Sequence, residues 1–374
     1  MSTRRRYGIG VAALLPEHEP LSLAPRHPAA HPGFGLAVEV EDGLVVAADP
    51  QPGLMHRSAE KLLESRDWRQ GMALADRHDW LSSISSEIGV ALTYEEALGI
   101  TPPTRATWIR TLLAEVNRVA VALAFLAPVA GSARTVADGL RERLVALQES
   151  VTGARMHPAF VRIGGVAGDL DEDVLAAHVD ALADVAAAVP QVADAVAAYA
   201  DPLAGAGVLT VDEVVAWGLS GPVARASGWD RDLRRDEPYL AYPLVADLVH
   251  VPVRSDGDVP ARYGVLAEQV PVSVDIALAC VEELRRLGDG PIEVQLPKVV
   301  RIPEGMTYVT MEGPIGITGC LLVGDGDKYP RRLKIRSASF ATLQALAPAL
   351  AGTPEDQVAD VVMSMPVILG DVDR

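Results

Sequence analysis

The segment RATWIRTLLAEVNRVAVALAFLA, residues 105–127, decides the fold class of this chain. Its apolar residues recur with a period of about 3.6, which predicts a helix over Arg105–Ala127. The charge-free run VAVALAFLAPVA, Val119 to Ala130, contains 12 residues, whereas a membrane span needs about 20. We therefore expect this helix to be buried inside the protein.

The same periodicity extends to both sides of this segment. It predicts helices over Ser58–Ser65, Ser82–Leu98, Val136–Val151 and Asp171–Ala198. Pro190 lies inside the last of these segments and should kink or split it, because proline has no backbone N–H. The middle of the chain is therefore predicted to be a helical bundle.

Extended patterns flank the bundle. The stretch GLAVEVEDGLVVAADP, residues 35–50, alternates apolar and polar residues around Asp42-Gly43, which predicts a hairpin of Gly35–Val40 and Leu44–Ala48. After residue 290 we expect short strands in IEVQL, TYVTMEG, GCLLVGDG and RRLKIRSA, followed by a helix over Ser339–Leu350.

The predicted fold class is α+β, with a central helical bundle, an N-terminal antiparallel β-hairpin unit and a C-terminal mixed strand/helix unit. We divide the chain into an N-terminal extension (1–20), an N-terminal β unit with a histidine loop (21–57), the helical bundle (58–290) and the C-terminal unit (291–374).

Composition excludes several classes of protein. The 374 residues are 49% hydrophobic, which is enough for a substantial core, and 33 basic against 50 acidic residues give a net charge of −17. Nucleic-acid binding is excluded because phosphate recognition needs a basic surface. Cys280 and Cys320 form no CxxC pair, so neither a disulfide framework nor a cysteine metal site is predicted, and a reducing cytoplasm fits best.

Histidines are the first candidates for chemistry. His27 and His31, in RHPAAHPG, have a spacing compatible with a metal site, but no acid or cysteine lies beside them with ligand spacing. A histidine in this loop could instead exchange a proton near neutral pH. No P-loop, G-x-S-x-G elbow or dinucleotide fingerprint occurs. The residues alone leave both alternatives open.

Seven motifs in one order resemble a known family. They are RHPAAHPG, DPQPGLMHRSAEKL, ADRHDWLSS, TGARMHPAFVRIGGVAGDL, GPVARASGWDRDLRRDEPY, RRLKIRSASFATLQAL and the terminal GDVDR. Together, from about residue 21 to residue 374, they resemble the D subunit of the proton-pumping NADH-quinone oxidoreductase, respiratory complex I (NDH-1).

The resemblance implies a fold akin to the large subunit of nickel–iron hydrogenases, and a chain that holds no cofactor of its own. Hydrogen chemistry is excluded because the two CxxC pairs of those enzymes are missing. FMN and the iron–sulfur clusters are expected in partner subunits. The nearest expected partners are the small subunit with the terminal cluster and the membrane subunit that forms the quinone channel. The expected location is the cytoplasmic face of the cell membrane, peripheral to it.

Four residues carry the implied functions. The family's HPxxH loop matches His27–His31, and its quinone-facing histidine, the expected proton donor, is His31. Its HR and ARMH motifs place Arg57 and His157 beside the partner's terminal cluster, where a cation and an imidazole stabilise the reduced cluster. Trp80 is the expected contact to the quinone head group.

Three departures separate this chain from the family pattern. Trp80 stands where the family motif DRxDY has tyrosine, and an indole N–H donates one hydrogen bond but does not readily release a proton. The family's aspartate after the long helix has no counterpart between Glu115 and Asp138, so we predict a lower pKa for His31. The segment PKVVRIPEGMTYVTM, residues 297–311, replaces a longer family segment.

Two functions follow from these matches and departures. In the first, the chain helps to reduce a quinone with electrons from NADH, coupled to proton translocation. Only four of the 33 basic residues are lysines, which suggests a GC-rich genome and hence menaquinone as the quinone. In the alternative, the chain is a divergent structural paralogue that keeps the subunit interface without supporting quinone reduction.

Overall fold

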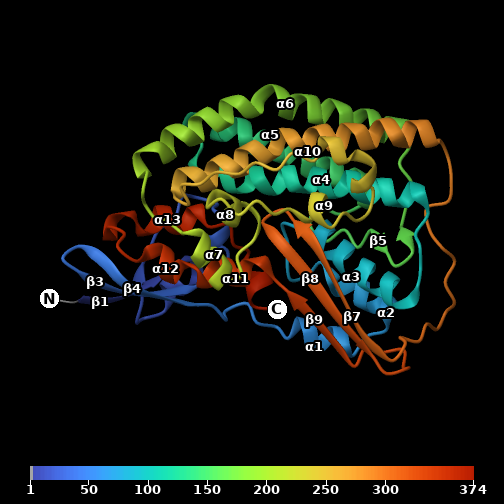
Figure 1. Cartoon of the computed structure of the whole chain (residues 1–374), viewed down its shortest axis with the longest axis horizontal. Helices are drawn as coiled ribbons and strands as arrows, with labels where there is room; N and C mark the ends of the chain where they lie inside the picture. The colour runs from blue at the N-terminus through green and yellow to red at the C-terminus, as the bar shows by residue number, and fades with distance from the viewer. Residues whose placement is uncertain (1–2) are drawn as a thin grey trace.

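Four long helices pack side by side in the computed structural model, which describes residues 3–374 (Figure 1). They are α4 (Thr104–Leu126), α5 (Arg134–Thr152), α6 (Glu172–Ala200) and α10 (Val259–Leu287). Helix α4 packs against α5 and α10, and α6 packs against the same two helices. These contacts form the predicted bundle.

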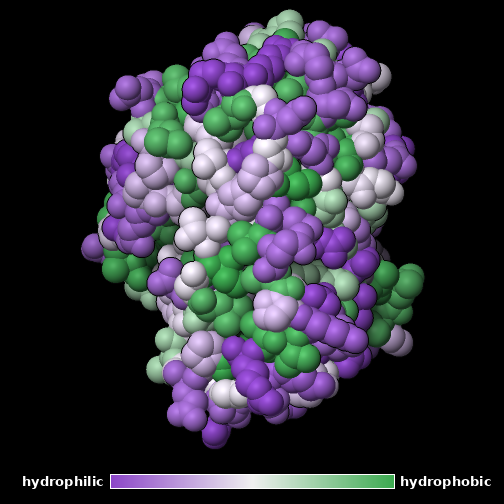
Figure 2. All heavy atoms as spheres, turned by 90° about the vertical axis from the view of Figure 1, so that its right-hand side faces the viewer, coloured by the Kyte–Doolittle hydropathy of each residue, from purple (hydrophilic) through white to green (hydrophobic). Residues whose placement is uncertain are grey.

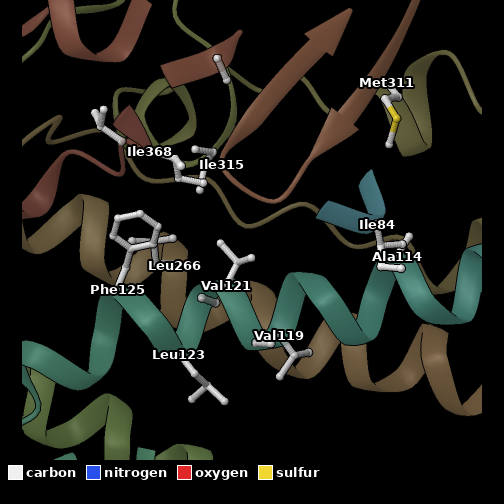
Figure 3. Packing of buried hydrophobic residues seen from close by; sticks show 14 of the residues in the cluster. Ile84, Ala114, Val119, Val121, Leu123, Phe125, Leu266, Met311, Ile315 and Ile368 are labelled. Atoms are coloured by element: carbon white, nitrogen blue, oxygen red, sulfur yellow. The ribbon is translucent and has the colours of Figure 1, made fainter. Parts of the chain in front are cut away.

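Helix α4 lies in the interior, as its sequence predicted. Figure 3 shows Phe125 and Val121 pointing toward Ile315, whereas Val119 and Leu123 point in the opposite direction. These side chains are at most 2% exposed. The helix is therefore covered on opposite faces, which explains its nearly continuous apolar sequence.

Among residues 3–374, three helical segments are long and apolar enough, by length and composition, to cross a membrane: residues 104–129, 172–203 and 259–287. The most apolar window of the first is 89% buried within the protein, against 33% for the second and 56% for the third. The burial of the first window agrees with the expectation of a buried helix.

The predicted helices agree with α1 (Ala59–Glu64), α3 (Ser83–Leu98), α4, α5 and α6 to within a few residues. Helix α6 continues through Pro190, so the predicted split is wrong, although Figure 1 shows the helix arched along its length. Helix α10 was not predicted as an element, because Pro260 and Pro271 interrupt its pattern. Pro260 lies in the first turn, where its missing N–H costs little.

The predicted hairpin is present as β3 (Gly35–Glu41) and β4 (Leu44–Gln51), joined by Asp42 and Gly43 with positive φ. Residues 1–20 had been separated as an extension, yet β1 (Thr3–Gly8) pairs with β3 in the same sheet. With β2 (Glu19–Pro20) the strand order is β2-β1-β3-β4. Strand β3 needs β1 because it is mostly buried and would otherwise leave backbone groups unpaired.

A second sheet contains β7 (Gly305–Gly313), β8 (Gly316–Gly324) and β9 (Arg332–Arg336), all antiparallel, and α3 packs against it. Three of the four strands predicted after residue 290 are thereby confirmed. The fourth, IEVQL, is wrong, since in residues 292–296 only Glu293 forms a bridge, to Gly165. Residues 292–296 lie beside the hairpin of β5 (Val161–Arg162) and β6 (Gly165–Val166). Each strand of this hairpin has only two residues, which is too short to pair with a five-residue strand.

The remaining helices are short. The predicted helix Ser339–Leu350 is divided into two at Ala345. The last residues, Gly370 to Asp373, are buried, and Figure 1 shows the C-terminus beside α11 rather than at an end of the molecule. These helices are α2 (Trp68–Ala75), α7 (Val211–Ala216), α8 (Gly221–Ala226), α9 (Leu233–Asp236), α11 (Ala338–Gln344), α12 (Leu346–Leu350), α13 (Val358–Ser364) and α14 (Leu369–Val372).

A buried ion network joins α4 to the region of α8, α9 and β7. Arg225 lies 2.8 Å from Glu312 and 3.3 Å from Asp232. Arg234 lies 2.8 Å from Asp232 and 3.1 Å from Glu115 of α4. All five side chains are fully buried, so each charge depends on its partners.

One hydrophobic core contains residues from all four parts of the predicted division, from Tyr7 to Val372. Residues 288–304 run down the right-hand edge of Figure 1 as an irregular strap. Figure 2 shows the face that carries this strap, where apolar residues gather toward the middle between hydrophilic ones.

Candidate functional site

His31 and Trp80 line one cavity of about 510 Å³, which we call the His31 cavity. It lies between the histidine loop, residues 80–83, α4 and α5. The structure thus brings together the two residues predicted to contact a quinone. The cavity volume is in the range typical of small-molecule sites. The apolar lining residues that α4 and α5 contribute are Val116, Ala120, Val121, Ala124, Leu144 and Val145.

His27 holds the histidine loop in place. Its ring is fully buried, with Nε2 3.0 Å from the carbonyl oxygen of Met363 and Nδ1 accepting a hydrogen bond from the N–H of Ala29. Burial lowers the pKa of His27 to about 4, so the imidazole is neutral and Nε2 is the donor. Both nitrogens are engaged, so His27 is a structural histidine and not a metal ligand.

His31 follows directly, at the end of the short 3₁₀ helix Pro28–Ala30, and its side chain is exposed to the cavity. Within residues 3–374 no carboxylate lies within ion-pair distance of its ring, and no group of three or more His, Cys, Asp or Glu side chains forms a metal site. The pair His27 and His31 therefore differs in function: one fixes the loop, and the other faces the cavity.

Asp138 of α5 also lines the His31 cavity, a position that the sequence motifs did not indicate. Its carboxylate lies 3.9 Å from Arg26 and 3.6 Å from Arg134, so its charge is directed to these two arginines. The spacing of Arg134 and Asp138, i and i+4 on one helix, could have predicted this ion pair from the sequence.

Trp80 is positioned by its neighbours on both sides. The N–H of Ser82 donates to the Asp79 carboxylate at 2.8 Å, and the amide of Asn117 on α4 donates to the Leu81 carbonyl oxygen at 2.8 Å. A Cβ atom on Gly370 would lie 2.5 Å from Cζ3 of Trp80. The absence of a side chain at Gly370 therefore lets the C-terminus pack directly against the indole.

A buried acid–base cluster lies just before Trp80, and sequence reasoning missed it. His78 Nδ1 is 3.3 Å from the carboxylate of Asp371, which also accepts a hydrogen bond from the Ser337 hydroxyl. Burial alone would lower the pKa of His78, but Asp371 raises it above its usual value. Burial, and then the charge of Asp371, raise the pKa of Asp79 to about 7.

Arg57 and His157 do not line the His31 cavity but contact two consecutive residues of the segment that leads to Trp80. An Arg57 Nη donates to the Arg77 carbonyl oxygen at 3.4 Å, and His157 Nδ1 lies 3.7 Å from the Asp76 carboxylate. Arg57 also lines a second cavity of about 230 Å³, together with His78.

Asp76 is paired with a second buried acid, Glu87 of α3. Glu87 accepts hydrogen bonds from the N–H groups of Phe160 and Val161, at 3.0 and 2.7 Å. Burial and the nearby charge of Asp76 raise the pKa of Glu87 to about 8, and burial raises the pKa of Asp76 as well. At neutral pH this pair holds a proton, beside His157.

Comparison with known proteins gives one consistent result. The family described as "Respiratory-chain NADH dehydrogenase, 49 Kd subunit" matches residues 132–302 and 294–374. The D subunit of NADH-quinone oxidoreductase that is numbered 1 in Streptomyces coelicolor is 43% identical over 100% of this chain and 99% of its own length. The D subunit numbered 2 in Streptomyces griseus subsp. griseus is 43% identical, covering 100% and 96%. The D subunit of Granulibacter bethesdensis is 36% identical, covering 95% and 96%.

Proposed function

The chain belongs to the D-subunit family of NADH-quinone oxidoreductase, and from this premise we propose that its His31 cavity receives the head group of a quinone. Electrons reach the quinone from NADH through FMN and iron–sulfur centres in partner subunits, and the reaction is coupled to proton translocation. The observation that carries the proposal is that His31 and Trp80, far apart in the sequence, line the same cavity.

Within this proposal His31 delivers a proton to the reduced quinone. Its ring is exposed to the cavity, whereas the His27 ring is neutral and fully engaged. The indole N–H of Trp80 donates a hydrogen bond to a quinone carbonyl oxygen. The apolar wall formed by α4 and α5 suits a flat apolar ring, and the quinone that we propose is menaquinone.

Arg57 and His157 belong to a second part of the proposal. They would lie beside the terminal iron–sulfur cluster of the partner small subunit, where the Arg57 cation favours the reduced cluster. His157 is backed by the proton-holding pair of Asp76 and Glu87, so it has a nearby proton source. The membrane subunit of the quinone channel would hold the chain at the cytoplasmic side of the membrane.

The test is to tag the chain in its host, purify the complex that contains it and compare wild type with His31→Ala. We expect all subunits to co-purify in both cases and quinone reduction to fall at least about tenfold in His31→Ala, since a positioned general acid contributes about 10²-fold or more. His250→Ala, which removes an exposed histidine outside the cavity, is the matched control. Wild-type quinone reduction by His31→Ala would refute the role given to His31.

A second function is favoured by one observation, the indole of Trp80 in place of a phenol. In this alternative the chain is a divergent structural paralogue that binds its partner subunits without supporting quinone reduction. Purification of a complete complex with inhibitor-sensitive NADH-dependent quinone reduction would exclude it. Recovery of only a few small partners, or of a complex that cannot reduce quinone, would establish it.

A further inference from the structure

Four arginines line the His31 cavity, and three of them lie within ion-pair distance of an acid. Arg26 and Arg134 share Asp138. Arg155 is held by Glu142 and Glu149, the latter at 2.9 Å. Each of these three cations therefore has at least one carboxylate within ion-pair distance.

The fourth arginine, Arg141 of α5, has no such partner. Within residues 3–374 no carboxylate lies within ion-pair distance of its guanidinium, and its Nε is buried without a hydrogen-bond partner. Burial lowers the pKa of Arg141, while Asp138 and Glu142 raise it, so both acids are near without pairing. An arginine with this environment is still charged at neutral pH.

The half-buried guanidinium of Arg141 has lost its hydrogen bonds to water at the buried Nε–H and has gained no partner there, which is unfavourable. A ligand with an anionic oxygen would restore these hydrogen bonds, and hydrogen bonds to a charged group are stronger than those between neutral groups. Other donors that line the cavity, such as the indole of Trp80 and the ring of His31, each provide a single hydrogen bond to one oxygen. Arg141 is thus the part of the cavity that can distinguish a charged oxygen from a neutral one.

We propose that Arg141 is a specificity-determining residue of the His31 cavity, which binds an anionic ring oxygen and makes the cavity favour deprotonated hydroxyquinones over their neutral ethers. This inference rests on the proposed function, because it takes a quinoid ring as the ligand. It extends that function by naming the charge that the cavity selects and the residue that selects it.

Two probes test the proposal: 2-hydroxy-1,4-naphthoquinone, which is an anion at neutral pH, and its neutral ether 2-methoxy-1,4-naphthoquinone. Binding to the purified complex is measured by equilibrium dialysis, so the readout does not depend on turnover. We expect Arg141→Gln to weaken binding of the anion by about tenfold, or about 1.4 kcal/mol, and to change binding of the ether by less than about twofold. Arg141→Lys should retain part of the wild-type affinity for the anion, because lysine keeps the positive charge but lacks the planar guanidinium group.

Arg143→Gln is the matched control, because Arg143 is an exposed arginine on the same helix that pairs with Asp184 and does not line the cavity. It should bind both probes like wild type. Co-purification of the same subunits with each variant establishes that the complex is assembled.

The pattern of binding across the variants decides between the outcomes. Selective loss of the anion in Arg141→Gln, with both probes bound normally by Arg143→Gln, supports the proposal. Equal binding of the anion by wild type and Arg141→Gln overturns it and leaves the proposed function intact, provided that the ether also binds. Failure of wild type to bind either probe contradicts the proposed function, and this inference with it.

Discussion

At position 80 the cavity has an indole, which donates one hydrogen bond, where a phenol would both donate and accept. We expect Trp80→Tyr to alter the kinetics of quinone reduction by the purified complex severalfold, because a phenol, unlike an indole, can release its proton within the cavity. Trp217→Tyr, at an exposed tryptophan directly after α7, should leave the kinetics unchanged. Identical kinetics in Trp80→Tyr and wild type would favour a purely structural role for the chain.

Glu87 makes the stability of the chain depend on pH. Its pKa is about 8 in the folded chain against 4.5 ordinarily, so between these values the folded state holds a proton that the unfolded state has released. The free energy of unfolding therefore falls as pH rises through this window. Glu87→Gln keeps an oxygen for the N–H groups of Phe160 and Val161 and has no proton to lose.

We expect the free energy of unfolding of Glu87→Gln to decline less than that of wild type between pH 5 and pH 8, by on the order of 2 kcal/mol. The measurement is urea unfolding of the full-length chain at a series of pH values. Glu96→Gln, at an exposed position of the same helix, should follow wild type. Parallel pH profiles for Glu87→Gln and wild type would mean that Glu87 is ionised in the folded chain.

At the scale of elements, α4 is fixed to α9 by Arg234, which bonds Glu115 and Asp232 in a fully buried environment. Replacing Arg234 with methionine would leave Asp232 with Arg225 alone and Glu115 with Arg118 alone, each at 3.3 Å. The buried negative charge would then be only partly compensated, so we expect a loss of about 3–5 kcal/mol in the free energy of unfolding. Arg235→Met removes the adjacent exposed arginine and should cost less than about 1 kcal/mol. The measurement is denaturant unfolding of both variants. Equal free energies of unfolding for Arg234→Met and Arg235→Met would show that the buried ion network does not stabilise the chain.

Helix α6 accommodates Pro190 on an exposed face without a break. The proline still removes one helical hydrogen bond, so we expect Pro190→Ala to stabilise the chain by about 1–2 kcal/mol, less than the full interior cost because the unfolded chain gains freedom. Ala187→Pro, one turn earlier and also exposed, should destabilise it by about 3 kcal/mol. A higher melting temperature for Pro190→Ala is the expected observation, and a lower one would mean that the bend itself is needed for packing.

At the scale of the whole molecule, the C-terminal end of the chain completes the structure around the site. Its residues lie beneath Trp80, with Asp371 bonded to His78 and Gly370 against the indole. Asp373 accepts hydrogen bonds from the N–H groups of Gly53 and Met55, which precede Arg57. One short segment thus supports both the His31 cavity and the second cavity.

Deleting residues 370–374 should therefore disrupt both cavities at once. We expect quinone reduction to be lost in the truncated chain. We also expect Trp80 to become more exposed to solvent, which should shift the tryptophan fluorescence of the truncated chain to longer wavelength. Extending the wild-type chain beyond Arg374 with a short flexible peptide is the control for a changed terminus. A truncated chain with unaltered fluorescence and activity would contradict the supporting role of the C-terminus.

The fold class, the hairpin, most of the long helices and the family could be predicted from the sequence, because these depend on local periodicity, turn chemistry and motifs that are contiguous along the chain. The sequence did not predict α10, since two prolines mask the helical pattern, or the pairing of β1 with β3, which depends on a partner about 30 residues away. Motif matching named His31, Trp80, Arg57 and His157, but their arrangement stayed unknown.

Which of these residues share a cavity could be seen only in the folded chain, because burial and charge pairing depend on contacts between distant segments. The same contacts bring acids within ion-pair distance of Arg26, Arg134 and Arg155 and leave Arg141 unpaired, although all four side chains have the same chemistry. They also bring Asp76 to Glu87, and His78 to Asp371, where the loss of water shifts the pKa values. A one-dimensional pattern contains no information on desolvation, which is a property of the packed chain.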